Sequence, residues 1–189
     1  MAVPTRFEAD RLLASLDLPP GIVVHSRGVS RVAAEAAGLL AAAGVDVDAD
    51  LVEVAALLHD IDKPEARRSG ELHGVVGARR LTELGYGELA GPVASHPVSC
   101  LLDPVRFPRG WEAILVAVAD RRVDQRFVTI DQRIDGMAER YPRYRDQLEA
   151  ARAPAHALEA SLALAAGLDG EELAERLRAA WQHGEEDVA

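Results

Sequence analysis

The sequence predicts an all-α fold, and three observations support this prediction. Apolar residues make up 49% of the 189 residues but aromatic residues only 4%, so we expect a core of mainly Ala, Leu and Val, which suits closely packed helices. Apolar residues recur at helical spacing in segment after segment. No segment shows the alternation of apolar and polar residues that is typical of a half-buried strand.

The first two thirds of the chain are expected to form six helices. A short one lies within residues 1–18, where Phe7 and three leucines recur at helical spacing before a Pro-Pro-Gly break. The other five are expected at residues 22–43, 51–58, 72–84, 87–95 and 111–119. Pro64 is expected to stop one of them, with the polar residues 65–71 as a loop after it. Residues 97–110 contain three prolines and are expected to be irregular.

The last third of the chain is amphipathic. Three helices are expected there, at about residues 130–141, 148–162 and 173–181. We therefore expect a core domain at residues 1–128, with a short N-terminal helix, and a C-terminal helical extension at residues 129–189. The extension would pack on the core or form the surface of a homodimer. His156 and His183 fall in it and are expected at the surface.

Two nearly all-apolar helices each end in a carboxylate. Residues 51–58 are apolar at all positions but one and lead into His59 and Asp60, and residues 111–119 lead into Asp120. A helix that is apolar on all sides is a buried helix, and a carboxylate at its end is costly unless it is paired, hydrogen-bonded or bound to a metal ion. For Asp120 alone, an ion pair with one of the two following arginines is a sufficient explanation.

Three further histidines are expected to point inward. His25 lies on the apolar stripe of its helix, His73 shares a helix face with Leu81 and Leu84, and His96 ends a helix just before a proline. Each has an ordinary structural alternative: His25 fits a core histidine bonded to a backbone carbonyl, and His96 fits a residue that caps a helix.

Six inward polar residues on five helices are difficult to satisfy one at a time, whereas one metal centre would satisfy them together. A mixed set of imidazoles and carboxylates suits Mn, Fe, Co, Ni or Zn better than Ca. Six ligands exceed what one open catalytic site needs, so we expect two divalent transition ions bridged by Asp60. The candidate ligands are His25, His59, Asp60, His73, His96 and Asp120.

The charge and cysteine content narrow the class of partner. The formal net charge is −10 and the pI is near 5, which argues against duplex nucleic acid and anionic membrane surfaces as partners. This net charge is still compatible with a small anionic substrate that a few local cations hold. Cys100 is the one cysteine, so no internal disulfide forms and a cytoplasmic setting is expected. The N-terminus does not look like a secretory signal, and the apolar runs are too short to span a bilayer.

The order H…HD…D, with LLHDIDK at its centre, resembles the HD superfamily of metal-dependent phosphohydrolases. The resemblance covers about residues 20–126. The matching residues are His25 in HSRGVSRVA, the doublet His59-Asp60, Asp120 in VAVADRRV and, for the two extra histidines of dinuclear members, His73 in HGVVGA and His96 in VASHP. The segments HGVVGA and ADRRVDQR are similar to those of bacterial hydrolases that split dinucleoside tetraphosphates symmetrically.

The resemblance implies a compact HD-domain bundle and a hydrolase. Such an enzyme would cleave a phosphoester or phosphoanhydride bond of a nucleotide or dinucleotide, by attack of a hydroxide that the metal ions activate. The implied ligands are His25, His59 and Asp120 for one ion and His73 and His96 for the other, with Asp60 as the bridge.

The resemblance also implies roles for the neighbouring cations. Lys63 would hold the substrate phosphate or assist the leaving group, which makes Asp60 and Lys63 the expected catalytic residues. Arg27, Arg121 and Arg126 are weaker candidates for phosphate binding.

Two other functions and one residue stay open at this point. The same helices would also serve a diiron oxygenase, or a non-catalytic regulatory domain that binds nucleotides, although a domain that only binds has no evident need for six ligands. Asp62, two residues after the doublet, is either a partner of a ligand histidine or a solvated residue at the end of a helix.

Overall fold

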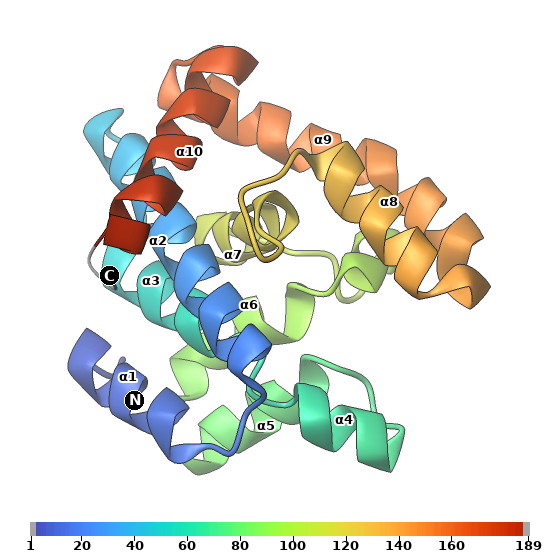
Figure 1. Cartoon of the computed structure of the whole chain (residues 1–189). Coiled ribbons are helices and arrows are strands. Elements are labelled where there is room, and N and C mark those ends of the chain that lie inside the picture. The colour runs from blue at the N-terminus through green and yellow to red at the C-terminus, as the bar shows by residue number, and fades with distance from the viewer. Residues whose placement is uncertain (1–2, 187–189) are drawn as a thin grey trace.

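The computed structural model of the chain describes residues 3–186 and is all-α, as predicted (Figure 1). Ten α-helices, three short 3-10 helices and one isolated bridge between Val123 and Phe127 make up the regular structure of these residues. The elements are α1 (Arg6–Ser15), α2 (Pro20–Ala42), α3 (Ala49–Leu58), α4 (Lys63–Ser69), α5 (Val75–Glu83), η1 (Gly87–Leu89), α6 (Ala90–Ser95), η2 (Val98–Leu102), α7 (Trp111–Arg122), α8 (Ile130–Arg140), η3 (Pro142–Tyr144), α9 (Arg145–Ala166) and α10 (Gly170–Glu186).

Helix α3 is the centre of the fold, because α1, α2, α6 and α7 all pack against it. Its start is fixed by Asp48, whose Oδ1 accepts a hydrogen bond of 2.9 Å from the Leu51 amide. Leu57 and Leu58 are fully buried, and each such side chain contributes about 1.5–3 kcal/mol to stability. Helix α7 is similarly buried, so both helices that were predicted to be buried are so.

The segment after α3 differs from the prediction. Helix α3 ends at Leu58, residues 59–62 form a turn, and α4 begins at Lys63 where a loop was expected. Pro64 lies in the first turn of α4, where an amide hydrogen has no helical partner, so the proline starts this helix rather than stopping the previous one. Gly70 ends α4 with a φ of 74°. The doublet therefore lies in a tight turn between two helices.

Two further expectations were wrong in detail. Helix α5 begins at Val75, so His73 lies in the turn before it rather than on its face. Leu84 and Phe7 are 47% and 71% exposed and do not face the core. Phe7 lies under the Arg11 guanidinium instead, 5.9 Å from ring centroid to Cζ. Helix α1 packs against α3, and its buried residues are Ala9 and Leu13.

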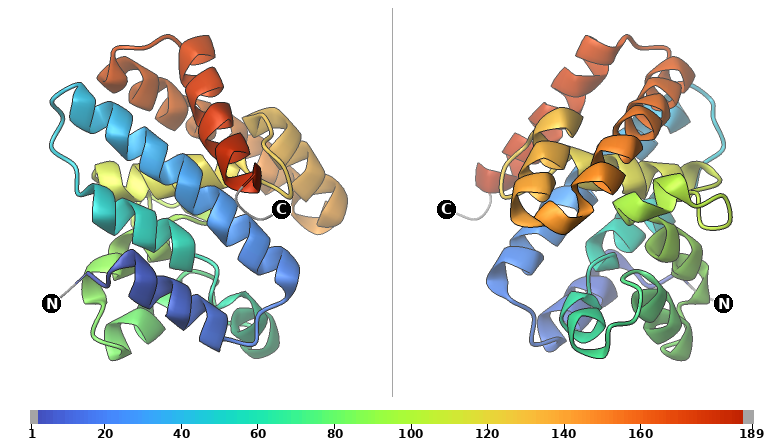
Figure 2. Two further views of the ribbon diagram at one scale, coloured as in Figure 1. Left: turned by 60° about the vertical axis from the view of Figure 1, so that its left-hand side comes forward. Right: turned by 90° about the vertical axis from the view of Figure 1, so that its right-hand side faces the viewer.

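The C-terminal helices pack into the same hydrophobic core as the first two thirds of the chain. Helix α10 lies along α2 (Figure 2), and α9 packs against η2, α7 and α8. Leu148, Leu162 and Leu177 belong to the same continuous apolar cluster as Leu57 and Leu115. The division at residue 128 stays a prediction. Among the described residues, no helix has the length and apolar character that crossing a membrane requires.

Candidate metal centre

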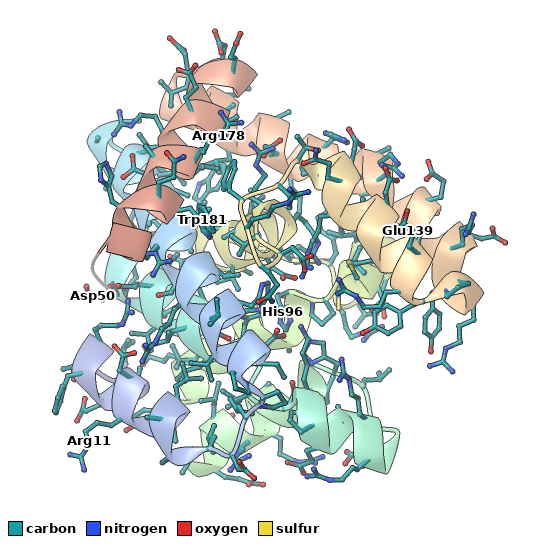
Figure 3. All side chains as sticks on the ribbon, in the orientation of Figure 1. Arg11, Asp50, His96, Glu139, Arg178 and Trp181 are labelled. Atoms are coloured by element: carbon teal, nitrogen blue, oxygen red, sulfur yellow. The ribbon has the colours of Figure 1, made fainter. Side chains whose placement is uncertain are left out.

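Six side chains from five segments meet beside the end of α3. His25 comes from α2, His73 from the turn before α5, His96 from the end of α6 and Asp120 from α7, around the doublet. Figure 3 shows His96 near the middle of the molecule. Five of the six are buried, and His73 is half-buried with 27% of its side chain exposed. The structure thus brings together all six of the candidate ligands.

The first pair of imidazoles consists of His25 and His59, whose Nε2 atoms lie 3.2 Å apart. Asp120 Oδ1 lies 3.0 Å from His25 Nε2 and 3.8 Å from His59 Nε2. Asp60 Oδ2 lies 3.6 Å and 3.4 Å from the same two nitrogens. Two imidazole nitrogens and two carboxylate oxygens therefore converge on one small volume.

The second pair consists of His73 and His96, whose Nε2 atoms lie 3.1 Å apart. Here the other oxygen of Asp60 faces the pair, because Oδ1 lies 3.0 Å from His73 Nε2 and 3.6 Å from His96 Nε2. This buried oxygen makes no hydrogen bond. Asp60 thus turns one oxygen to each pair, which is the geometry of a bridging carboxylate.

Two of the histidines are oriented by the helices they follow. His59 Nδ1 donates to the Ala56 carbonyl at 2.7 Å, and His96 Nδ1 donates to the Val93 carbonyl at 2.6 Å. In both cases the acceptor is a carbonyl in the last turn of the helix, which has no amide partner there. In the neutral form of each ring Nδ1 carries the hydrogen, and Nε2 then carries a lone pair that points at the carboxylates and the other imidazole.

The surroundings of His25, His73 and His96 shift the pKa values of their imidazoles. Burial lowers the pKa of His96 to about 3 and also lowers the pKa of His25, so both rings are neutral near pH 7. Burial acts the same way on His73, but the carboxylates of Asp60 and Asp62 outweigh it and raise its pKa to about 9. Without a metal ion, His73 therefore holds a proton that a cation would displace.

The carboxylates stay ionised at neutral pH. Burial works to raise the pKa of Asp60, but His59 and Lys63 hold it well below its usual range. Burial is likewise outweighed at Asp120, where the Arg121 guanidinium keeps the pKa well below its usual range. Both side chains are therefore available as anionic ligands.

The donor set fits divalent transition ions. The candidate ligand atoms of His25, His59 and Asp120 all lie within 4.8 Å of one another, and so do those of His59, Asp60 and His96. Unprotonated Nε2 atoms beside buried carboxylate oxygens are ligands that Mn, Fe, Co, Ni and Zn accept, and the unbonded Oδ1 of Asp60 lacks the partner that buried oxygens usually have.

A comparison with protein families matches residues 22–122, more than half of the chain, to the HD domain. The chain belongs to the HD domain family. An uncharacterized protein of Methanocaldococcus jannaschii is 40% identical to it over 77 residues, which are 41% of this chain and 44% of that protein. The match thus spans less than half of the relative's length. No solved structure matches the chain. The resemblance to the HD superfamily is confirmed, and the similarity to dinucleoside tetraphosphate hydrolases stays a prediction.

The four predicted phosphate-binding cations lie in different places. Lys63 forms an ion pair with Asp60 Oδ2 and lines the pocket above the centre. Arg121 is buried and donates to Asp120 Oδ2 at 2.6 Å and to the His96 carbonyl. The remaining two predicted cations point elsewhere: Arg27 lies 3.7 Å from Asp10, and Arg126 is exposed in a separate hollow beside α8.

The candidate metal centre forms part of the floor of two adjoining hollows of about 530 and 660 Å³. His25 and Asp60 line the first hollow, and His96 and Asp120 line the second. Side chains from beyond the HD domain match also line both of them. These are Arg133 and Met137 of α8, Tyr141, and Arg143 and Tyr144 of η3. No sequence signal predicts this role, because a helix that only packs against the core has the same amphipathic pattern as α8.

Asp62 is the residue whose role the sequence left open. It is fully buried, and its Oδ1 accepts a hydrogen bond of 2.6 Å from His73 Nδ1. Its Oδ2 accepts bonds of 2.7 Å and 2.9 Å from the amides of Gly74 and Gly77. A Cβ at Gly77 would lie 3.3 Å from Asp62 Cγ, so the glycine permits this approach. Asp62 is therefore the partner of a candidate ligand histidine and not a solvated residue.

Arg133 was also missed by sequence reasoning. It comes from α8, is 8% exposed, and donates to Asp120 Oδ1 at 3.2 Å and to Asp124 Oδ1 at 2.6 Å. Asp124 in turn offers its carbonyl to His25 Nδ1 at 3.3 Å. The C-terminal helices thus reach the first pair through one guanidinium.

Proposed function

We propose that the protein is a metal-dependent phosphohydrolase that cleaves a phosphoester or phosphoanhydride bond of a nucleotide or dinucleotide. The observation that carries this proposal is the division of the two Asp60 oxygens between two imidazole pairs, in the floor of a pocket. Membership of the HD domain family supports it, since the order of ligands is that of the hydrolases in this superfamily.

Two divalent transition ions (Mn, Fe, Co, Ni or Zn) fit the centre. The first pair and Asp120 would hold one ion, the second pair would hold the other, and Asp60 would bridge them. When bound, such ions lower the pKa of a water molecule and neutralise charge on phosphoryl oxygens.

The residues around the centre complete the proposal. Lys63 has its ammonium beside Asp60 and 26% of its side chain exposed, so it is the cation best placed to contact a phosphoryl oxygen or the leaving group. This geometry favours Lys63 over Arg27, Arg121 and Arg126 for phosphate binding. Arg121 instead keeps Asp120 ionised and in place.

The expected partner is a small phosphorylated molecule rather than duplex nucleic acid or a membrane, because the chain carries a net charge of −10. A cytoplasmic setting is supported by the single cysteine, Cys100, which is free and buried. A homodimer through the C-terminal helices remains part of the proposal.

Phosphate release from a panel of nucleotides and dinucleotides, with protein stripped of metal and reloaded with Mn or Fe, tests this function. We expect turnover of at least one substrate, and a loss of about a thousandfold or more in the double variant His59→Ala and Asp60→Ala. His156→Ala, which removes an exposed histidine, should retain activity.

Other outcomes of the same experiment would contradict the proposal. Substrate-dependent oxygen consumption by the iron-loaded protein, without release of phosphate, would indicate a diiron oxygenase. Nucleotide binding without turnover in the metal-replete protein would indicate a regulatory domain. Full activity in the double variant would show that the centre is elsewhere.

A further inference from the structure

Two arginines from different segments of the chain line both hollows. Arg67 belongs to α4, directly after the doublet, and Arg143 belongs to η3, beyond the residues that match the HD domain. Figure 1 shows α4 and α8, which leads into η3, on the same side of the molecule. The two guanidinium groups are therefore contributed to one pocket by the HD domain and by the helices that follow it.

These arginines differ from the other cations of the pocket. Lys63, Arg133 and Arg140 each form an ion pair with a carboxylate, at Asp60 or Asp124. Within residues 3–183, whose side chains the structure describes, no carboxylate oxygen lies within ion-pair distance of Arg67 or Arg143.

The contacts of both guanidinium groups are with neutral side chains. Arg67 Nη2 donates to the Tyr141 hydroxyl at 3.3 Å, and Arg143 Cζ lies 4.7 Å from the centroid of the Tyr144 ring. A hydroxyl and an aromatic face position a guanidinium without cancelling its charge. Both arginines are solvent-exposed, and neither has a carboxylate partner among the described side chains; Glu71 also lines both hollows but pairs with Arg79.

We propose that Arg67 and Arg143 form a subsite for a second phosphate group of the substrate, while the metal centre holds the phosphate that is cleaved. This inference rests on the proposed phosphohydrolase function. Planar guanidinium groups match phosphate oxygens in geometry and charge, and an acidic protein needs such local cations to attract a doubly phosphorylated molecule. The substrate class is then a molecule with phosphate groups at two separated positions.

A series of alkanediol bisphosphates of increasing chain length tests the subsite. Each is compared with the hydroxyalkyl monophosphate of the same length, using the metal-replete full chain. We expect one chain length at which the KM of the bisphosphate is about tenfold or more below that of the monophosphate, in accordance with charge-assisted hydrogen bonds. A tenfold difference in KM exceeds the twofold difference expected only because a bisphosphate offers two equivalent phosphate groups to the metal centre. Equal KM values at every length would overturn the proposal.

The double variant Arg67→Gln and Arg143→Gln shows whether these arginines are responsible. It should raise the KM of the preferred bisphosphate about tenfold and so remove the difference between the paired substrates. Arg68→Gln makes the same charge change on the next residue of α4, which is exposed and outside both hollows, and should retain the wild-type ratio. A double variant that keeps the ratio would overturn the proposal.

A binding measurement separates this inference from the proposed function. If no phosphate ester is cleaved, calorimetric titration of the metal-replete protein with the same bisphosphates still tests the subsite. Binding that weakens about tenfold in the double variant but not in Arg68→Gln supports the subsite, even though the proposed function has failed. Equal affinity in all three proteins overturns it.

Discussion

The two imidazole pairs of the candidate centre differ in the charge of the groups behind them: these groups are positive at the first pair and negative at the second. Behind the first pair, Asp120 is held by two buried arginines, Arg121 from its own helix and Arg133 from α8. Behind the second pair, the buried anion Asp62 holds His73 from the side away from Asp60. The first pair is also more deeply buried, with His25 only 4% exposed, whereas 27% of the His73 side chain is exposed.

From this difference we expect that the two proposed ion sites can be disturbed separately. Arginines behind Asp120 keep a ligand ionised, and they act on a pair whose histidines come from α2 and the end of α3. The carboxylate behind His73 fixes which ring nitrogen carries the hydrogen, and it acts on a residue in a turn. Only Asp60 is shared, so changes at Asp60 and at Asp62 should give different losses of metal.

The largest effect is expected from Asp60→Asn. The amide has about the same shape but lacks the charge that both ions would share, so both should be lost. We expect metal content, measured by elemental analysis, to fall from two ions per chain to none, and hydrolysis to fall about a thousandfold or more. A variant that keeps two ions, with unchanged helical circular dichroism, would show that Asp60 is not the bridge.

A smaller and one-sided effect is expected from Asp62→Asn. The amide cannot accept hydrogen bonds from His73 and from both glycine amides, so the ring is expected to turn or to change its tautomer. Loss of such a partner typically costs about 10–100-fold in metal affinity. We expect metal titration to show one tight ion and one weakened by this factor.

Asp48→Asn is the matched control for Asp62→Asn. It makes the same chemical change at the start of α3, where asparagine caps a helix about as well as aspartate does. This control should bind two ions as the wild type does. Equal weakening of both ions in Asp62→Asn would mean that the two halves of the centre are not separable.

The sequence predicted the fold class from its apolar patterns, and it predicted the residues that the structure brings together from those patterns and the resemblance to the HD superfamily. A buried helix with a carboxylate at its end, as at Asp60 and Asp120, conflicts with its surroundings unless something satisfies it. The position of His73 was not predictable in the same way. Helix spacing placed it on a helix face, but the left-handed Gly74, with a φ of 86°, puts it in a turn.

The partners of the centre were harder to predict than its candidate ligands. Asp62 was left open because its role depends on where two glycine amides point, which no local pattern encodes. Arg133 and Arg143 lie in a segment whose apolar stripe only shows that one face is packed. Which polar residues of that segment reach the pocket depends on how α8 lies against the HD domain, a tertiary property.

The smallest effect is expected from Gly77→Ala, and it tests the packing behind the second pair. An added Cβ would lie 3.2 Å from Val93 Cγ1 and 3.3 Å from Asp62 Cγ, so Asp62 should shift by a few tenths of an ångström. The usual gain of up to about 1 kcal/mol for alanine over glycine in a helix should therefore be cancelled. The affinity for the second ion should fall a few-fold, because His73 moves with its partner.

Gly91→Ala provides the comparison, since nothing lies within 4 Å of a Cβ added there. This variant should be as stable as the wild type or slightly more so in urea unfolding, with both ions bound normally. The difference between the two variants measures the cost of crowding Asp62. If Gly77→Ala gained as much stability and bound both ions fully, close packing against Asp62 would not be what positions His73, and the second pair would depend on the hydrogen bond alone.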